Sequence, residues 1–171
     1  DRYLLKNLTK GNSPYENSFD RNPTTIATIH SHPLNTPPSG SDLINTAKWL
    51  KDFDTQACRT NYVYTAKAIY AFHIENETKA LAFYSKYSYC QRTEGSTTMF
   101  KSGTELATLW DKLLTKYSRY SAEEQYMSAL TELLSQTNSG IHLMKKEITD
   151  IDFGIHGVKK VDDILIPIKC K

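Results

Sequence analysis

The pattern of hydrophobic and polar residues changes its period several times along the chain. Polar and apolar residues alternate from Thr24 to His32, and this period of two predicts a β-strand. Alternate residues of a strand point to the same side, so one face would carry Ile26, Thr28, His30 and His32. Pro33 ends the strand because it has no N–H to donate. Residues 35–40 have the composition of a compact turn.

After this turn the pattern predicts helices and further strands. A helix is expected at 41–53, where Leu43, Ala47 and Leu50 recur at helical spacing. Two strand-like runs, at 62–74 and 79–87, are expected to pair as a hairpin. Amphipathic helices are expected at 104–117 and 122–135, and two or three short strands after residue 141, with 164–168 the clearest. The sequence therefore predicts an α/β fold with a mixed sheet flanked by helices.

Length and composition limit the classes of function. A chain of 171 residues fits one domain, so residues 104–171 are assigned to the same domain as the rest. The net charge of +2, without a long Lys/Arg run, argues against a nucleic-acid partner held mainly by phosphate contacts. No stretch approaches the ~18–20 apolar residues of a membrane span. A Cys58–Cys90 disulfide and free buried thiols both stay open, and Cys170 has no assigned role.

His30, His32 and Asp42 are the residues that point most clearly to chemistry. Residues two apart on a strand lie on one side with Cα atoms ~6.5–7 Å apart. Both imidazoles can therefore reach one zinc ion with bonds of ~2.0–2.1 Å. The turn reverses the chain and brings Asp42 back in the first turn of the helix. Two His and one carboxylate leave a fourth tetrahedral position for water, which is the layout of a catalytic zinc site.

The serine and aspartate of this segment also have an explanation without a metal. Ser39 and Asp42 fit a capping box, with Ser at the helix N-cap and an acid three residues later. This explanation does not account for two same-face histidines in front of a Pro-rich turn. We therefore interpret His30, His32 and Asp42 together as a zinc site.

The segment His30-Ser-His-Pro33, followed by Ser39-Gly-Ser-Asp42, resembles the motif of the JAMM (MPN-type) metallopeptidases. That motif is His-x-His-Pro, a short loop and Ser-x-x-Asp, and the family includes eukaryotic deubiquitinating enzymes and many bacterial members. The resemblance implies zinc ligands at His30, His32 and Asp42, and a Ser39 that helps to hold the polarised carbonyl. It also implies a cytidine-deaminase-like core. The implied activity is hydrolysis of a peptide or isopeptide bond in a protein or peptide substrate by a zinc-activated water.

The sequence departs from the family pattern at two points. Nine residues separate His32 from Asp42, one fewer than is usual in the family, and Pro37-Pro38 are expected to absorb the deletion. The family places its general-base Glu on a strand well upstream, but here Glu16 alone precedes the motif, in a segment that reads as loop. Our hypothesis is that the base lies upstream of Asp1 or is missing. Glu16 as the catalytic base is the alternative.

Several alternatives to a working peptidase stay open. The chain fits an inactive JAMM-like scaffold or partner-binding module as a second class of function. A metallo-β-lactamase would need an Asp and a further His where Leu34 and Asn35 stand. His73 fits a half-buried core histidine or a residue that contacts a ligand. The start at Asp1 leads to the expectation that this is the C-terminal domain of a longer, exported or toxin-like bacterial polypeptide.

Overall fold

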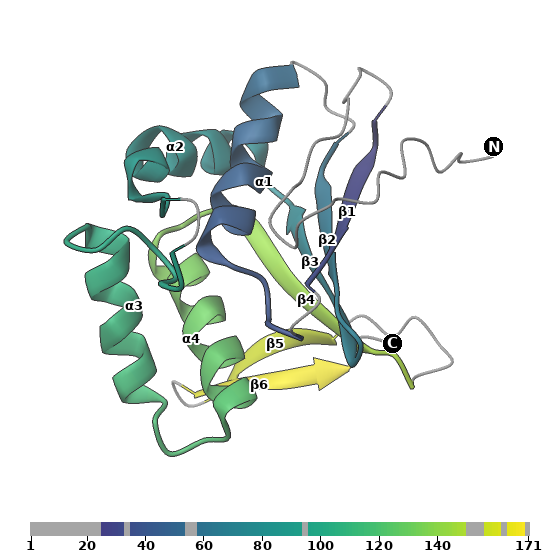
Figure 1. Ribbon diagram of the computed structural model, residues 1–171, viewed down its shortest axis with the longest axis vertical. Helices are drawn as coiled ribbons and strands as arrows, with labels where there is room; N and C mark the ends of the chain where they lie inside the picture. The colour runs from purple at the N-terminus through teal and green to yellow at the C-terminus, as the bar shows by residue number, and fades with distance from the viewer. Residues whose placement is uncertain are drawn as a thin grey trace.

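The computed structural model describes residues 25–32, 35–53, 58–93, 96–149, 156–161 and 164–169. Within these residues, six strands and four α-helices, with a 3₁₀ turn at Ser88–Cys90, follow one another as shown in Figure 1. The strands are β1 (Ala27–Ser31), β2 (Thr60–Tyr64), β3 (Ala68–Ile74), β4 (Ile141–Glu147), β5 (His156–Val161) and β6 (Ile164–Lys169). The helices are α1 (Gly40–Phe53), α2 (Glu77–Tyr87), α3 (Glu105–Lys116) and α4 (Ala122–Gln136).

The strands form one mixed sheet in the order β1-β2-β3-β4-β5-β6. β1 runs parallel to β2, with His30 opposite Val63, and every other neighbouring pair is antiparallel. Parallel neighbours need a crossover connection, and α1 supplies it between β1 and β2. The predicted α/β class with a mixed sheet is confirmed.

The helices lie on one side of the sheet in Figure 1, and the hydrophobic core fills the space between these two layers. Alternate residues of β3, such as Phe72 and Ile74, point into this core and are fully buried. On the opposite side of the sheet, Ile29, Tyr62 and Tyr64 are exposed. The side of β1 that carries Thr28 and His30 is therefore the side that faces α1.

The predicted hairpin is wrong in its position. Residues 62–74 are not one strand, because the chain turns at 65–67 and the hairpin forms between β2 and β3. Residues 79–87 lie in α2 and not in a strand. Asn76 caps α2 by accepting from the N–H of Lys79 at 3.0 Å, and the residues of this helix that face the core recur at helical spacing.

The other predicted elements agree with the structure. The helices predicted at 41–53, 104–117 and 122–135 correspond to α1, α3 and α4, and the predicted C-terminal strands to β4, β5 and β6. Cys90 is a free buried thiol, so it forms no disulfide with Cys58, which is also buried. Glu16 and Cys170 lie outside the described residues.

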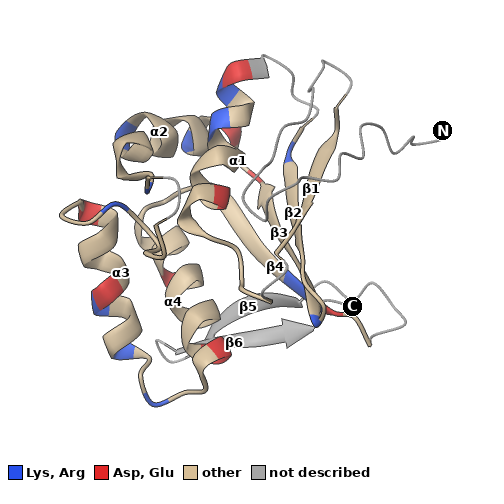
Figure 2. Cartoon of the chain, in the orientation of Figure 1, with Lys and Arg blue, Asp and Glu red and all other residues tan. Residues whose placement is uncertain are grey.

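The described helices are mixed in charge and are not of the membrane-spanning kind. Figure 2 shows Lys and Arg interspersed with Asp and Glu along the helices. No described helix combines the length and the apolar character that crossing a membrane requires.

Candidate metal centre

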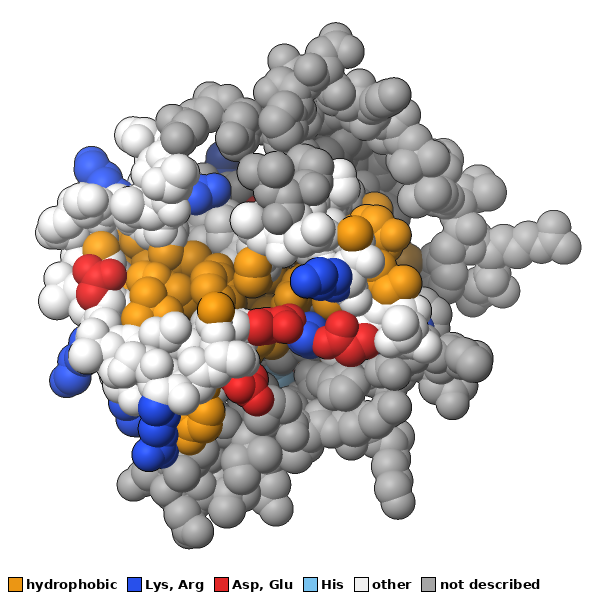
Figure 3. All heavy atoms as spheres, turned by 60° about the horizontal axis from the view of Figure 1, so that its bottom comes forward, with side chains coloured by type: hydrophobic (Ala, Val, Ile, Leu, Met, Phe, Trp, Pro, Cys, Tyr) orange, Lys and Arg blue, Asp and Glu red, His pale blue; other side chains and the backbone are white. Residues whose placement is uncertain are grey.

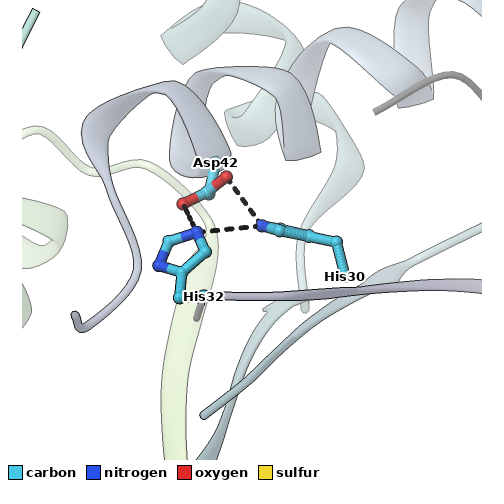
Figure 4. A group of neighbouring side chains, drawn as sticks. All are labelled: His30, His32 and Asp42. Carbon is cyan, nitrogen blue, oxygen red and sulfur yellow. Dashed lines mark hydrogen bonds and ion pairs between the residues drawn. The ribbon is translucent and has the colours of Figure 1, made fainter. Parts of the chain in front are cut away.

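Two adjacent elements supply the three predicted ligands. His30 lies on β1 and points towards α1, and His32 follows directly after the strand. The N–H of His32 donates to the carbonyl of Tyr64 at 2.8 Å, which extends the β1–β2 pairing by one residue. Asp42 lies in the first turn of α1. Figure 4 shows the three side chains pointing towards one another.

The three candidate donor groups form a compact triangle. His30 Nε2 lies 3.2 Å from His32 Nε2 and 3.1 Å from Asp42 Oδ1. His32 Nε2 lies 3.5 Å from Asp42 Oδ2. A tetrahedral ion with bonds of ~2.0–2.1 Å spaces its ligand atoms by ~3.3–3.4 Å. The separation of the two histidine nitrogens is close to that spacing, and each nitrogen lies within 3.1 or 3.5 Å of a different oxygen of Asp42. Among the described residues, this is the one cluster of three such groups.

The ring of His32 is oriented by the turn that follows it. Its Nδ1 lies 3.0 Å from the carbonyl oxygen of Thr36 and 3.2 Å from that of Pro37. Carbonyl oxygens only accept, so Nδ1 carries the proton and Nε2 keeps its lone pair for a ligand. Metal-bound histidines are usually held in this way, through a hydrogen bond from the other ring nitrogen.

Ser39 holds the third ligand. The backbone N–H of Ser39 donates to Asp42 Oδ2 at 2.6 Å, and its hydroxyl donates to the same oxygen at 2.8 Å. In return, the N–H of Asp42 donates to the hydroxyl oxygen of Ser39 at 3.3 Å. The capping box predicted from the sequence is therefore present, and it fixes the same carboxylate that faces the two histidines. The predicted contact of Ser39 with a polarised carbonyl stays a prediction.

The carboxyl group of Asp42 is ionised at neutral pH. Burial raises its pKa, but the hydrogen bond from His30, the charges that His30 and His32 carry when they are protonated, and the N–H of Ser39 together lower the pKa below its ordinary value. Only 12% of the side chain is exposed. A buried, ionised carboxylate beside two imidazoles is suited to holding a divalent cation.

A buried polar network supports the site from behind. The side-chain N–H of Asn61 on β2 reaches the backbone carbonyl of Asp42 at 3.4 Å and the hydroxyl of Thr46 at 3.3 Å. The hydroxyl of Thr28 donates to the side-chain oxygen of Asn61 at 3.0 Å. Asn61 is completely buried, so this network fixes β1, β2 and α1 to one another. The sequence analysis did not identify Asn61. An Asn at an inward-facing position of a strand with alternating polar and apolar residues is the feature that could have indicated it.

The position of the turn is fixed at a second point. Asn35 adopts a left-handed backbone conformation with φ of 55°, which Asn tolerates better than most residues. Its side-chain oxygen accepts from the N–H of Ala66 at 2.8 Å, and its own N–H donates to the carbonyl of His32 at 3.0 Å. The turn is thus attached to the loop between β2 and β3.

Most of the glutamates in the described part of the chain have partners away from the metal site. Glu75 pairs with His142, Glu77 with Arg59, and Glu123 with Lys145. None of the described glutamates makes a hydrogen bond or ion pair with His30, His32 or Asp42. Glu16 lies outside the described residues. His73, the other histidine considered for a contact, is half-buried on the opposite side of the sheet and bonds Thr60.

Comparisons with known proteins give no relative. No family model matches the chain, and neither does any curated protein or solved structure. The residues and the geometry of this site are therefore the basis on which a function is proposed.

Proposed function

We propose that this chain binds a zinc ion through His30, His32 and Asp42 and is a JAMM-like metallopeptidase. The observation that carries the proposal is the cluster of two imidazoles and one carboxylate. The two Nε2 atoms lie 3.2 Å apart, and they face Asp42 Oδ1 at 3.1 Å and Asp42 Oδ2 at 3.5 Å. Three protein ligands, two of them imidazoles and one a carboxylate, leave a fourth tetrahedral position for water or substrate. This is how catalytic zinc sites differ from closed structural ones.

Hydrogen bonding alone explains the triangle less well. His30 Nε2 carries at most one proton, so it can satisfy Asp42 Oδ1 or His32 Nε2 but not both. The 3.5 Å separation between His32 Nε2 and Asp42 Oδ2 is long for a hydrogen bond. Oδ2 is also already bonded twice by Ser39. A cation in the centre would satisfy all three groups at once.

The residues of the site have distinct roles in the proposed reaction. When bound, zinc would lower the pKa of a water and polarise the scissile carbonyl. Asp42 supplies the negative charge of the site, and the turn carbonyls keep His32 in the tautomer that binds. Ser39 fixes the carboxylate, and its predicted donation to the developing oxyanion would add to this role. Glu16 is the candidate in this chain to take a proton and return it to the leaving amine.

The proposed family also bears on the fold and the substrate. The order strand, helix, antiparallel strands, with the ligands at the strand end and the helix start, supports a cytidine-deaminase-like core. The proposed substrate is a protein or peptide, cleaved at a peptide or isopeptide bond. A zinc-binding scaffold without activity is the second candidate, because the described glutamates make no hydrogen bond or ion pair with the three ligands.

The test combines metal content with hydrolysis. Protein that has been loaded with zinc and dialysed should retain one zinc ion per chain by mass spectrometry, and His30→Ala and His32→Ala should lose it. His142→Ala is the matched control, because His142 is exposed on β4 and pairs with Glu75. A wild-type protein that retains no zinc would overturn the proposal. Zinc retention without cleavage of peptide or isopeptide-linked substrates would favour the scaffold.

A further inference from the structure

The turn between β1 and α1 can form few hydrogen bonds within its own backbone. Pro37 and Pro38 have no N–H group, so neither donates to a neighbouring carbonyl of the turn. Buried backbone carbonyls need a donor from elsewhere. The carbonyls of Thr36 and Pro37 lie at hydrogen-bond distance from the ring of His32, as described above. Pro38 is buried, and the donor to its carbonyl comes from a distant part of the chain.

That donor is Tyr126 on α4. Its hydroxyl donates to the carbonyl of Pro38, across a sequence separation of 88 residues. Figure 1 shows the segment that leads into α1 passing beside α4. The next residue after Pro38 is Ser39, which is bonded to Asp42. Tyr126 therefore bonds the residue directly before Ser39, and Ser39 fixes the carboxylate of Asp42.

Tyr126 is itself held in place by its surroundings. Its ring packs edge-on against Trp110 of α3 with centroids 5.0 Å apart, and Trp110 packs edge-on against Phe100. The sulfur of Met99 lies 3.1 Å from the Tyr126 hydroxyl. A Cβ atom added at Gly40 would lie 2.2 Å from the carbonyl oxygen of Met99, so the start of α1 also packs closely on this surface.

The Tyr126 hydroxyl keeps its proton. Burial raises the pKa of the phenol, and the nearby carboxylate of Asp42 raises it further. A protonated phenol donates to the Pro38 carbonyl throughout the pH range in which zinc would bind, so the contact does not depend on pH.

We propose that Tyr126 is a positioning residue of the metal centre. By holding the Pro38 carbonyl, it keeps the turn in the conformation in which the ring of His32 and the carboxylate of Asp42 meet. The inference rests on the zinc site proposed above and assigns α3 and α4 a part in building it. The hydroxyl of Tyr126 bonds Pro38 and Met99, and makes no hydrogen bond to His30, His32 or Asp42.

Tyr126→Phe tests this role, because it removes the hydroxyl and keeps the ring against Trp110. Zinc affinity, measured by competition with a chelator, should fall about 3–10-fold, less than the ~10–100-fold typical of groups that touch a ligand directly. The visible absorption spectrum of the cobalt-substituted protein should also change. Tyr70→Phe is the matched control, since Tyr70 is a buried tyrosine whose hydroxyl also makes a hydrogen bond, to Glu123 at 2.9 Å. It should leave the zinc affinity and the cobalt spectrum unchanged.

A second measurement needs no metal. In the zinc-free protein, the N–H of Ser39 is bonded to Asp42, and its hydrogen exchange should be at least about threefold faster in Tyr126→Phe. Unchanged exchange together with unchanged zinc affinity would overturn the role of Tyr126. A wild-type protein that binds no zinc would overturn the proposed function instead, and the exchange rate alone would then decide the role of Tyr126.

Discussion

Ser39 holds one oxygen of the Asp42 carboxylate, and both oxygens face the histidines of the metal site. Oδ2 of Asp42 accepts from both the N–H and the hydroxyl of Ser39 and lies 3.5 Å from His32 Nε2, whereas Oδ1 faces His30 Nε2 at 3.1 Å. The helix cap and the metal site therefore share a residue. A change at the cap should alter both helix stability and metal affinity.

We expect Ser39→Ala to affect both properties and Ser39→Thr to preserve both. Alanine removes the cap hydroxyl, which should lower the free energy of unfolding by about 1 kcal/mol. It also removes one of the two bonds to Oδ2, so zinc affinity should fall about tenfold. Threonine retains a hydroxyl on the same carbon. Urea unfolding and chelator competition measure the two effects, and loss of stability without loss of affinity would show that Ser39 only caps α1.

Measuring turnover would distinguish the third role predicted for Ser39, donation to the oxyanion, from its roles in the helix cap and in zinc binding. If the hydroxyl donates to the developing oxyanion, Ser39→Ala at saturating zinc should lower kcat by about 10²–10³. Steady-state kinetics at zinc concentrations far above the dissociation constant remove the affinity effect. An unchanged kcat under these conditions would contradict the oxyanion role while leaving the cap intact.

Zinc should stabilise the folded protein measurably. A ligand that binds only the folded state contributes about 2.7 kcal/mol at a hundredfold excess over its dissociation constant. For a chain of this size, that corresponds to a rise in Tm of about 5–10 °C. Asp42→Asn keeps the shape of the side chain but removes its charge, so the rise should disappear. A rise of equal size in both proteins, by calorimetry, would place the ion elsewhere.

The packing around Gly40 predicts a steric effect close to the site. A Cβ atom at Gly40 would lie 2.2 Å from the Met99 carbonyl oxygen and 2.7 Å from the ring of Phe100. Gly40→Ala should therefore cost about 1–3 kcal/mol and weaken zinc binding, because α1 must move to relieve the clash.

Gly103→Ala is the control for this prediction. Gly103 has φ of +78° and no other atom near an added Cβ. The substitution should cost about 1–2 kcal/mol through backbone strain alone, with no change in zinc affinity. Equal zinc affinities in the two variants would show that the start of α1 can shift without disturbing Asp42.

Local patterns were sufficient to predict the unit that carries the site. The alternation ending at His32, the proline after it and the Ser39–Asp42 cap are all short-range signals, and they placed β1 and α1 to within a few residues. The error at 79–87 also has a local cause. Phe83, Tyr84 and Tyr87 favour strands, but the Asn76 cap and the spacing of the buried Ala80, Phe83 and Tyr87 indicate a helix.

The residues that support the site could not be found in the same way. Asn61 reaches the backbone of Asp42 from 19 positions away, and Tyr126 reaches Pro38 from 88. Such contacts depend on the pairing of β1 with β2 and on the packing of α4, which no local pattern specifies. A buried Asn or Tyr in a regular element carries no mark of which distant residue it will meet.

An ion pair at the start of α4 predicts a pH-dependent contribution to stability. The face shown in Figure 3 carries acidic and basic side chains side by side, next to a hydrophobic area. Glu123 pairs with Lys145 at 2.5 Å and accepts from the hydroxyl of Tyr70 at 2.9 Å. Burial raises the pKa of Glu123, but the bonds from Lys145 and Tyr70 lower it below its ordinary value of 4.5.

A carboxyl group with a lowered pKa in the folded state stabilises the protein above its unfolded pKa. This stability is lost as pH falls below 4.5, through the folded pKa. Glu123 is about half exposed, so screening limits the effect, and Glu123→Gln should cost about 0.5–1 kcal/mol at pH 7 in low salt. The difference from wild type should shrink as pH falls below 4.5. Urea unfolding across this pH range measures it, and a cost that does not depend on pH would contradict the charge effect.

The source of the general base decides between a peptidase and a scaffold. Two glutamates, Glu16 and Glu94, lie outside the described residues, and Glu16 alone precedes the metal motif. The segment around Glu16, residues 12–18, has the composition of a loop, whereas the JAMM resemblance implies a base on a strand. We therefore expect zinc-loaded protein to turn over slowly, and Glu16→Gln to change its rate by less than about twofold. A working base contributes about 10²–10⁴-fold to the rate.

Glu16→Gln and Glu94→Gln should be assayed on the same peptide and isopeptide substrates, with zinc content measured in parallel and Asp42→Asn as the metal-free control. Both glutamine variants should retain the ion, because neither residue is among the proposed ligands. A fall of a hundredfold or more in Glu16→Gln, at full zinc occupancy, would identify Glu16 as the base and make this chain a peptidase in its own right. The same fall in Glu94→Gln would assign the base to the segment between the 3₁₀ turn and α3. Equal, low rates in all the zinc-loaded proteins are the outcome we expect, because a zinc site without a base binds its ligand but transfers the proton poorly.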